Sequence, residues 1–92
     1  MEKRTPHCKL SLVKSLIQTG KVRSTFSALQ GAASLGLDFK GVLQIINKLE
    51  PKDFYKSMTT YADHTVWQDV YRPITSVGEV YLKFTVMKEV LI

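Results

Sequence analysis

Hydrophobic residues in the first half of the chain recur with the spacing of a helix. The first such stripe predicts a helix that ends at Gly20 and consists of Leu10, Val13, Leu16 and Ile17. Thr5 would cap this helix, and Pro6 would stand at its first position, where a missing N–H costs nothing. The first helix is therefore expected to begin within the opening residues of the chain.

Two further stripes predict two more helices. Thr25 would cap the second helix, which closes at Gly36. Asp38 would cap the third, and Pro51 would end it because the proline ring clashes with the preceding turn. The inward positions are Phe26, Leu29, Ala32, Ala33 and Leu35 in the second helix and Phe39, Val42, Ile45, Ile46 and Leu49 in the third. Residues 21–24, which precede the second helix, predict a connector or a short edge strand.

From residue 54 onward the residues that favour strands (Thr, Tyr, Val and Trp) dominate. Strands are expected over residues 54–61, 66–72, 80–86 and 90–92, with a loop over residues 73–78 and a turn at residues 88–89. Helices followed by consecutive strands with short links predict an α+β fold in one domain, residues 1–92. We expect an antiparallel sheet that about three N-terminal helices cover on one face, with the other face partly open.

Charge is concentrated at the start of the chain. The 92 residues include 13 Lys and Arg and 8 Asp and Glu, for a net charge of +5. Residues 1–23 contain six basic residues and one acid, Glu2, whereas the charges of residues 24–92 cancel. A basic segment on a neutral body suits a polyanion such as RNA, DNA or an acidic protein, although a solvated helix kept for solubility remains the alternative.

Several classes of protein are disfavoured. A single cysteine, Cys8, excludes an internal disulfide framework, and no His or Cys spacing predicts a metal site. The sequence contains no P-loop pattern and no nucleophile-elbow motif. No signal peptide or membrane span is expected, so the default is a cytoplasmic protein with reduced Cys8 and no membrane partner.

Four polar residues of the predicted strands have the spacing of a site. Gln68 and Arg72 lie on one face of their strand, and Lys56 and Tyr81 on neighbouring strands would converge with them on the open face. Arg72 would hold phosphate oxygens, and Gln68 would orient a sugar or base. Lys56 would add charge, or act as a base if nearby cations lowered its pKa. Each residue alone also fits a solvated strand face or packing.

The same residues carry a family resemblance. Residues 53–61, 63–65, 67–73 and 80–83, together with residues 1–7 and 35–39, resemble the MqsR family of toxins. The resemblance implies a RelE-like fold and a bacterial type II toxin, a metal-independent endoribonuclease that needs no cofactor and cuts mRNA at short GC-containing sites. It also implies an MqsA-like antitoxin, with a zinc-binding N-terminal domain and a helix-turn-helix C-terminal domain. Operon promoter DNA would be contacted only through that antitoxin.

The resemblance also implies roles for individual residues. The catalytic residues of the family fall on Lys56, Gln68 and Tyr81, with Arg72 as a neighbouring cation. Apart from the resemblance, the basic first helix is expected to attract the RNA backbone through Lys9, Lys14 and Arg23, and further RNA contacts are expected at Tyr55, Lys83 and Lys88. Lys88 stands where a relative has His, so proton transfer is not expected there. The family pattern continues for a few residues beyond Ile92 into a basic tail, so the expectation is either a truncated chain or a shorter last strand with one cationic group fewer.

The expected reaction is attack of a 2′-hydroxyl on the adjacent phosphorus, which yields a 2′,3′-cyclic phosphate and a free 5′-hydroxyl. Lys56 or Tyr81 would transfer protons. The alternatives are a non-catalytic nucleic-acid or protein-binding module and a transcriptional co-regulator that acts only with its antitoxin.

Overall fold

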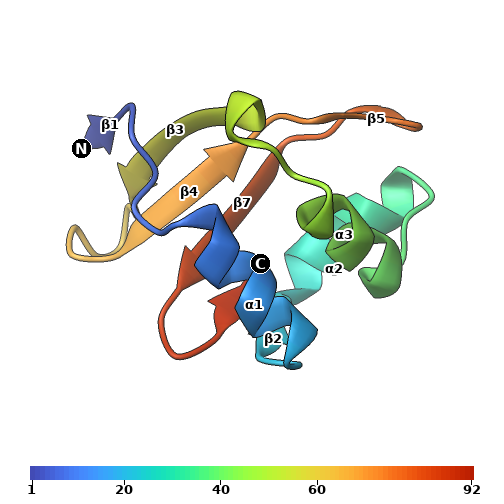
Figure 1. Ribbon diagram of the computed structural model, residues 1–92, viewed down its shortest axis with the longest axis horizontal. Coiled ribbons are helices and arrows are strands. Elements are labelled where there is room, and N and C mark those ends of the chain that lie inside the picture. Colours follow the sequence, from blue (N-terminus) through green and yellow to red (C-terminus); the bar gives the residue numbers. More distant parts are fainter.

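A computed structural model describes all residues, 1–92, and confirms the α+β class. Three helices alternate with short strands at first, and most of the sheet follows (Figure 1). The elements are β1 (Glu2–Lys3), α1 (Leu10–Gln18), β2 (Val22–Arg23), α2 (Phe26–Ser34), α3 (Phe39–Asn47), a 3₁₀ turn (Pro51–Asp53), β3 (Phe54–Thr59), β4 (Trp67–Tyr71), β5 (Ile74–Thr75), β6 (Gly78–Glu79), β7 (Leu82–Val86) and β8 (Val90–Leu91). None of the helices is long and apolar enough to cross a bilayer.

The main sheet has six strands in the order β1-β3-β4-β7-β8-β2. Its neighbours are antiparallel except β2 and β8, which run parallel, so the sheet is mixed and not purely antiparallel as expected. Residues 21–24 thus supply an edge strand. The predicted loop over residues 73–78 was wrong in part, because β5 and β6 form a small hairpin there.

Helices α2 and α3 begin where their caps predicted. The Thr25 hydroxyl accepts a hydrogen bond from the Ala28 N–H at 3.2 Å, and the Asp38 carboxylate accepts one from the Gly41 N–H at 2.7 Å. These side chains satisfy N–H groups that the first turn of a helix leaves without partners. Gly36 follows α2 with a φ of 78°, a conformation that favours glycine at the end of a helix.

The expected start of the first helix was wrong. Helix α1 begins at Leu10, and its preceding residue, Lys9, makes no capping hydrogen bond with its side chain. The opening residues instead pair with the sheet: β1 runs antiparallel to β3, with Glu2 opposite Met58 and Lys3 opposite Ser57. Long-range strand pairing therefore prevailed over the local Thr5–Pro6 signal.

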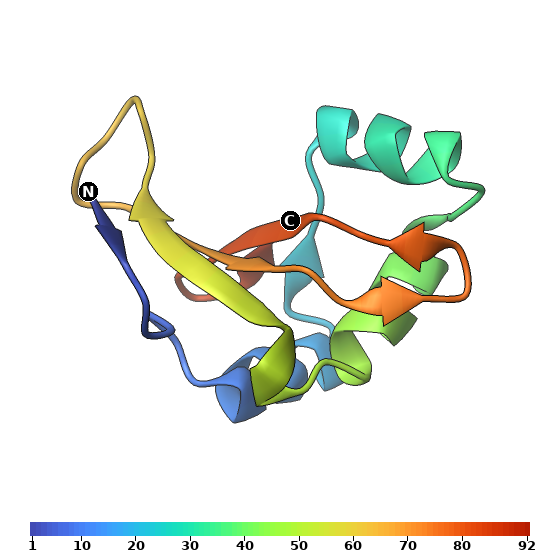
Figure 2. The ribbon, with the colours of Figure 1, turned by 90° about the horizontal axis from the view of Figure 1, so that it is seen from above.

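The core lies between one face of the sheet and the helices α1 and α3. Eight buried side chains form it: Val13, Ile17, Ile46, Leu49, Tyr71, Leu82, Phe84 and Val90. Figure 2 shows α1 below the strands and α2 above them, at the end where β5 and β6 project. Because side chains alternate along a strand, the residues between the core positions of β4 and β7 face the opposite side. We call this side the open face.

Candidate active site

The open face is crossed by a row of residues from three strands. Lys56 on β3 pairs with Val70 on β4, which pairs with Lys83 on β7. Gln68 and Arg72 lie two residues on either side of Val70 and share its face. The structure thus brings four of the predicted residues onto one surface around Val70, which they and their neighbours bury completely.

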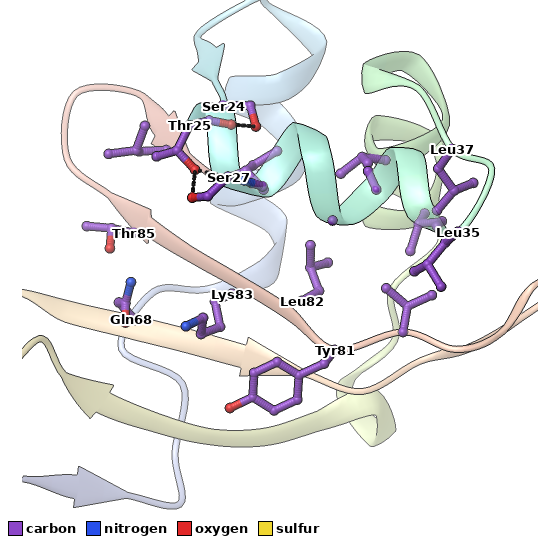
Figure 3. A pocket seen from close by; sticks show the side chains of 18 residues that line it. Ser24, Thr25, Ser27, Leu35, Leu37, Gln68, Tyr81, Leu82, Lys83 and Thr85 are labelled. Carbon is purple, nitrogen blue, oxygen red and sulfur yellow. Dashed lines mark hydrogen bonds between the residues drawn. The ribbon is translucent and has the colours of Figure 1, made fainter.

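Tyr81 joins this surface at the start of β7. Its side chain is 54% exposed, and its hydroxyl is not held by another side chain. It lines a groove of about 600 Å³ together with Gln68 and Lys83. Figure 3 shows these three side chains on the strands and α2 as the facing wall of the groove. The opposite wall contributes the hydroxyls of Ser24, Thr25 and Ser27. The groove therefore continues the open face toward α2, and its lining is partly polar and partly apolar.

Tyr55 lies at the centre of a group of cations. A shift in register between Phe54 and Lys56 marks a bulge at Tyr55. The Tyr55 ring centroid is 5.6 Å from the Arg4 guanidinium, 5.3 Å from Lys56 Nζ and 4.9 Å from the Arg72 guanidinium. Three positive charges therefore surround one half-exposed aromatic ring.

Two acids balance the cations of this site. Lys56 Nζ lies 2.6 Å from Glu2 Oε1, and Arg72 Nε lies 2.7 Å from Glu79 Oε1. The hydrogen bond to Glu2 raises the pKa of Lys56, and the same contact lowers the pKa of Glu2. The neighbour of Lys56 is thus a carboxylate and not the cation that a lysine base would need. Lys56 remains an ammonium ion at neutral pH.

The position of the opening segment, residues 1–8, against the sheet determines which charges reach the site. Asp69 is buried on the core side of β4, and its two oxygens accept hydrogen bonds from the N–H groups of His7 at 2.9 Å and Cys8 at 3.0 Å. The His7 ring stacks on Trp67 with centroids 5.4 Å apart. Together with the β1–β3 pairing, these contacts bring Glu2 and Arg4 to the edge of the open face.

Sequence reasoning missed three charged residues of this site: Glu2, Arg4 and Glu79. Glu2 and Arg4 were overlooked because the predicted first helix left the opening residues unassigned. One signal pointed to Glu2, since it is the single acid among residues 1–23. Glu79 lies in the β5–β6 hairpin, just beyond the loop predicted over residues 73–78.

The remaining predicted RNA contacts lie apart from this group. Lys14 is on α1, across the sheet from the open face, and its Nζ donates a hydrogen bond to the Leu49 carbonyl at 2.6 Å. Lys9 immediately precedes α1. Arg23 on the edge strand β2 pairs with Glu89 at 2.6 Å, and Lys88 lies in the turn between β7 and β8. The structure does not bring these four residues together with Lys56.

Comparison with known proteins identifies the family. The family model described as "Motility quorum-sensing regulator, toxin of MqsA" matches residues 5–92. The chain belongs to this family. A relative in the MqsR family, "mRNA interferase toxin MqsR" of Escherichia coli (strain K12), is 62% identical over 92 residues, which are 100% of this chain and 94% of the relative. The resemblance found in the sequence is thereby confirmed.

The open face of this MqsR-family chain has definite chemical abilities. Its ammonium and guanidinium groups attract phosphate, and the guanidinium of Arg72 offers several donors in one plane. Gln68 supplies an amide that both donates and accepts, and Tyr81 supplies a hydroxyl. Glu2 is the carboxylate nearest to Lys56. The site therefore combines charge stabilisation with groups that orient a polar ligand and exchange protons.

Proposed function

We propose that this chain is an mRNA interferase: a sequence-specific endoribonuclease toxin that cuts mRNA at short GC-containing sites without a metal ion. Membership in the MqsR family supports the activity class. The observation that carries the proposal is the gathering of Lys56, Gln68, Arg72 and Tyr81 on one face of the sheet. Cleavage of mRNA would stop translation and growth.

In the proposed reaction a ribose 2′-oxygen attacks the adjacent phosphorus. The O2′–P bond forms as the P–O5′ bond breaks, which gives a 2′,3′-cyclic phosphate and a 5′-hydroxyl. Lys56 and Arg72 stabilise the negative charge of the phosphorane, because fixed cations at this point favour the transition state. Tyr81 donates a proton to the leaving 5′-oxygen, and Gln68 orients the nucleotide. The substrate phosphate displaces Glu79 from Arg72 as it binds.

The RNA would follow the open face. A base stacks on Tyr55, and Lys83 contacts the backbone where the strand enters the groove beside α2. Lys9, Lys14, Arg23 and Lys88 attract the RNA backbone at longer range, because they lie outside this surface.

The partner we propose is an MqsA-like antitoxin, in agreement with the family description "toxin of MqsA". Its zinc-binding N-terminal domain would hold the toxin, and its helix-turn-helix domain would bind the operon promoter. Promoter DNA would then meet this chain only through the antitoxin.

The activity is tested by incubating the purified chain with a defined mRNA in EDTA and mapping the cuts. We expect cuts at a recurring short sequence, with cyclic phosphate and 5′-hydroxyl ends. The Lys56→Ala Tyr81→Ala variant should lose them. A matched Lys40→Ala Tyr61→Ala variant changes an exposed lysine of α3 and a fully exposed loop tyrosine and should keep them.

Three outcomes would contradict parts of this proposal. If the Lys56→Ala Tyr81→Ala variant still cuts RNA, the chain is a nuclease but these residues are not its active site. New 5′-phosphate ends would exclude 2′-oxygen attack. A wild-type chain that binds RNA but never cuts it would favour a non-catalytic binding module.

A further inference from the structure

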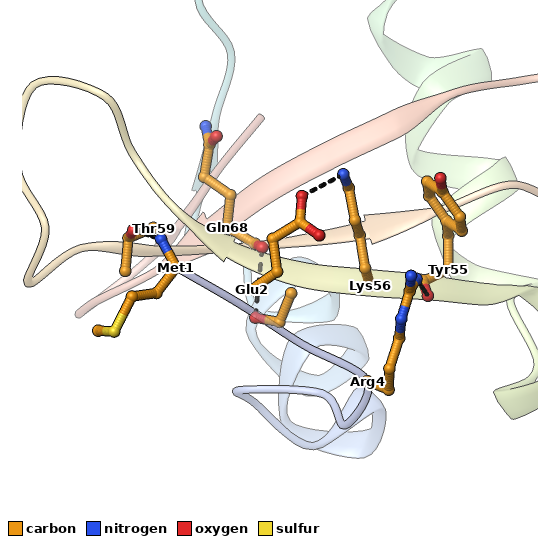
Figure 4. Close-up of polar contacts among 8 residues, drawn as sticks. Met1, Glu2, Arg4, Tyr55, Lys56, Thr59 and Gln68 are labelled. Atoms are coloured by element: carbon orange, nitrogen blue, oxygen red, sulfur yellow. Dashed lines mark hydrogen bonds and ion pairs between the residues drawn. The ribbon is translucent and has the colours of Figure 1, made fainter.

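Glu2 occupies an unexpected position for a residue of the opening segment. In the paired strands Glu2 is opposite Met58 of β3, and Met58 is opposite Gln68 of β4. Residues opposite one another in a sheet project to the same side, so Glu2 faces the open face beside Gln68. Figure 4 shows the Glu2 carboxylate between the side chains of Gln68 and Lys56.

The two oxygens of this carboxylate differ. Oε1 is 2.6 Å from Lys56 Nζ, whereas Oε2 accepts no hydrogen bond from any group of the protein. The Glu2 side chain is 52% exposed, while that of Lys56 is only 17% exposed. One oxygen is therefore fixed by a cation of the site, and the other has no partner on a side chain that is half exposed.

We propose that Glu2 is the general base that takes the proton from the attacking 2′-hydroxyl, an inference that rests on the proposed nuclease function. Oε2 accepts the proton as the O2′–P bond forms. The P–O5′ bond breaks, and the Tyr81 hydroxyl protonates the departing 5′-oxygen. Water then removes the proton from Glu2 and returns one to Tyr81, so the chain is unchanged after each cut.

The other groups of the open face suit this role less well. Lys56 is already protonated, since the pKa of its ammonium is raised by the hydrogen bond to Glu2. The Gln68 amide does not accept protons at neutral pH. Glu79 lies in the β5–β6 hairpin beside Arg72, which is four residues along the chain from Gln68, whereas Glu2 shares a register row with Gln68.

The charges that face Glu2 keep its carboxylate ionised and so free to accept a proton, although the lowered pKa also makes it a weaker base. The pKa of Glu2 is lowered below its ordinary value of 4.5, first by the hydrogen bond and charge of Lys56, then by Arg4 and the amino group of Met1. The carboxylate is therefore ionised at neutral pH. A base of lowered pKa acts at the lower end of the rate factors of about 10² to 10⁴ that general bases contribute.

The test compares Glu2→Gln with the wild type in two measurements. The first is the single-turnover rate of cleavage. The second is the affinity for an RNA with a 2′-deoxy nucleotide at the cut, which binds but cannot react. We expect Glu2→Gln to lower the rate about 100-fold or more, while its affinity stays equal or increases because a negative charge near phosphate is removed.

A matched control is Glu50→Gln, which alters a carboxylate paired with the exposed Lys52 and should leave both quantities unchanged. The pH profile adds a readout that a merely structural role would not produce. The wild-type rate should fall as pH decreases below about 4.5, and Glu2→Gln should lack this limb.

Other results would overturn the assignment. Equal loss of rate and affinity would make Glu2 a structural residue. If Glu2→Gln cleaves RNA faster than the wild type, the Glu2 carboxylate competes with the substrate phosphate for Lys56. An unchanged rate would leave it without a role in the reaction. If the wild-type chain itself does not cleave RNA, the proposed function fails, and the assignment of Glu2 fails with it.

Discussion

At the scale of single residues, Asp69 shows how a buried carboxylate organises a site that it does not enter. Only 3% of Asp69 is exposed. Its two carboxylate oxygens accept hydrogen bonds from the backbone N–H groups of His7 and Cys8. Hydrogen bonds to an ionised acceptor are stronger than neutral ones. They direct the segment before Cys8 along β3, which places Glu2 beside Lys56.

Asp69→Asn should therefore destabilise the fold and release this segment. The amide has one acceptor oxygen, and its NH₂ group would face an N–H donor of the backbone. We expect a loss of about 2 kcal/mol in the free energy of unfolding, measured with urea. Hydrogen exchange of the His7 and Cys8 amides should accelerate. Asp63→Asn, in an exposed turn, should cost less, and equal losses in both variants would deny Asp69 this anchoring role.

At the scale of elements, the sheet separates the cations into two groups. Helix α1 packs on the core face, so Lys9 and Lys14 lie across the sheet from Lys83. Strands β3, β4 and β7 present Lys56, Arg72 and Lys83 together because their register aligns these side chains. The excess charge of the first 23 residues thus lies largely away from the open face.

This arrangement predicts different salt dependences for the two groups. Each phosphate contact of a single strand contributes a slope of about −0.7 in log affinity against log salt. Lys83→Gln should reduce the slope by about that amount for a 2′-deoxy-substituted RNA. The variant Lys9→Gln Lys14→Gln should change it much less. A larger effect of the double variant would mean that the RNA crosses α1.

At the scale of the whole molecule, stability depends on one apolar layer between the sheet and two helices. Tyr71 lies at its centre, with 1% of its surface exposed, and its ring stacks on Phe84 with centroids 5.5 Å apart. Burial, followed by the nearby charge of Asp69, raises the pKa of Tyr71 to about 12. Ionisation of this residue is therefore linked to folding.

The sign of this linkage predicts loss of stability in alkali. The folded chain holds the Tyr71 proton more tightly than the unfolded chain, whose tyrosines ionise near the ordinary value of 10.0. This contribution is complete below about pH 10 and declines as the pH increases to about 12. Urea unfolding across this range should reveal the decline. Tyr71→Phe, which keeps the ring, should reduce it, and an identical decline in Tyr71→Phe would assign it to other groups.

Local chemistry in the sequence determined much of this protein. Thr25 and Asp38 marked the starts of α2 and α3, because a capping side chain acts on N–H groups only two or three residues away. The period of two along β4 placed Gln68 and Arg72 on one face for a similarly local reason. The α+β class followed from the change in hydrophobic period near residue 54.

The tertiary structure decided what depends on residues distant in sequence. Thr5 and Pro6 carried a helix signal, yet the opening residues pair with β3 at Glu2–Lys3 and are held by Asp69 at His7 and Cys8, and the helix begins only at Leu10. The parallel pairing of β2 with β8 likewise had no local signal. Glu2 meets Lys56 only because folding aligns β1 with β3, and that contact lowers the pKa of Glu2 and raises the pKa of Lys56. Helix caps and the two faces of a strand depend on residues only a few positions apart, so the sequence specifies them locally. Which charged group lies next to a reactive side chain depends instead on which strands become neighbours in the folded chain.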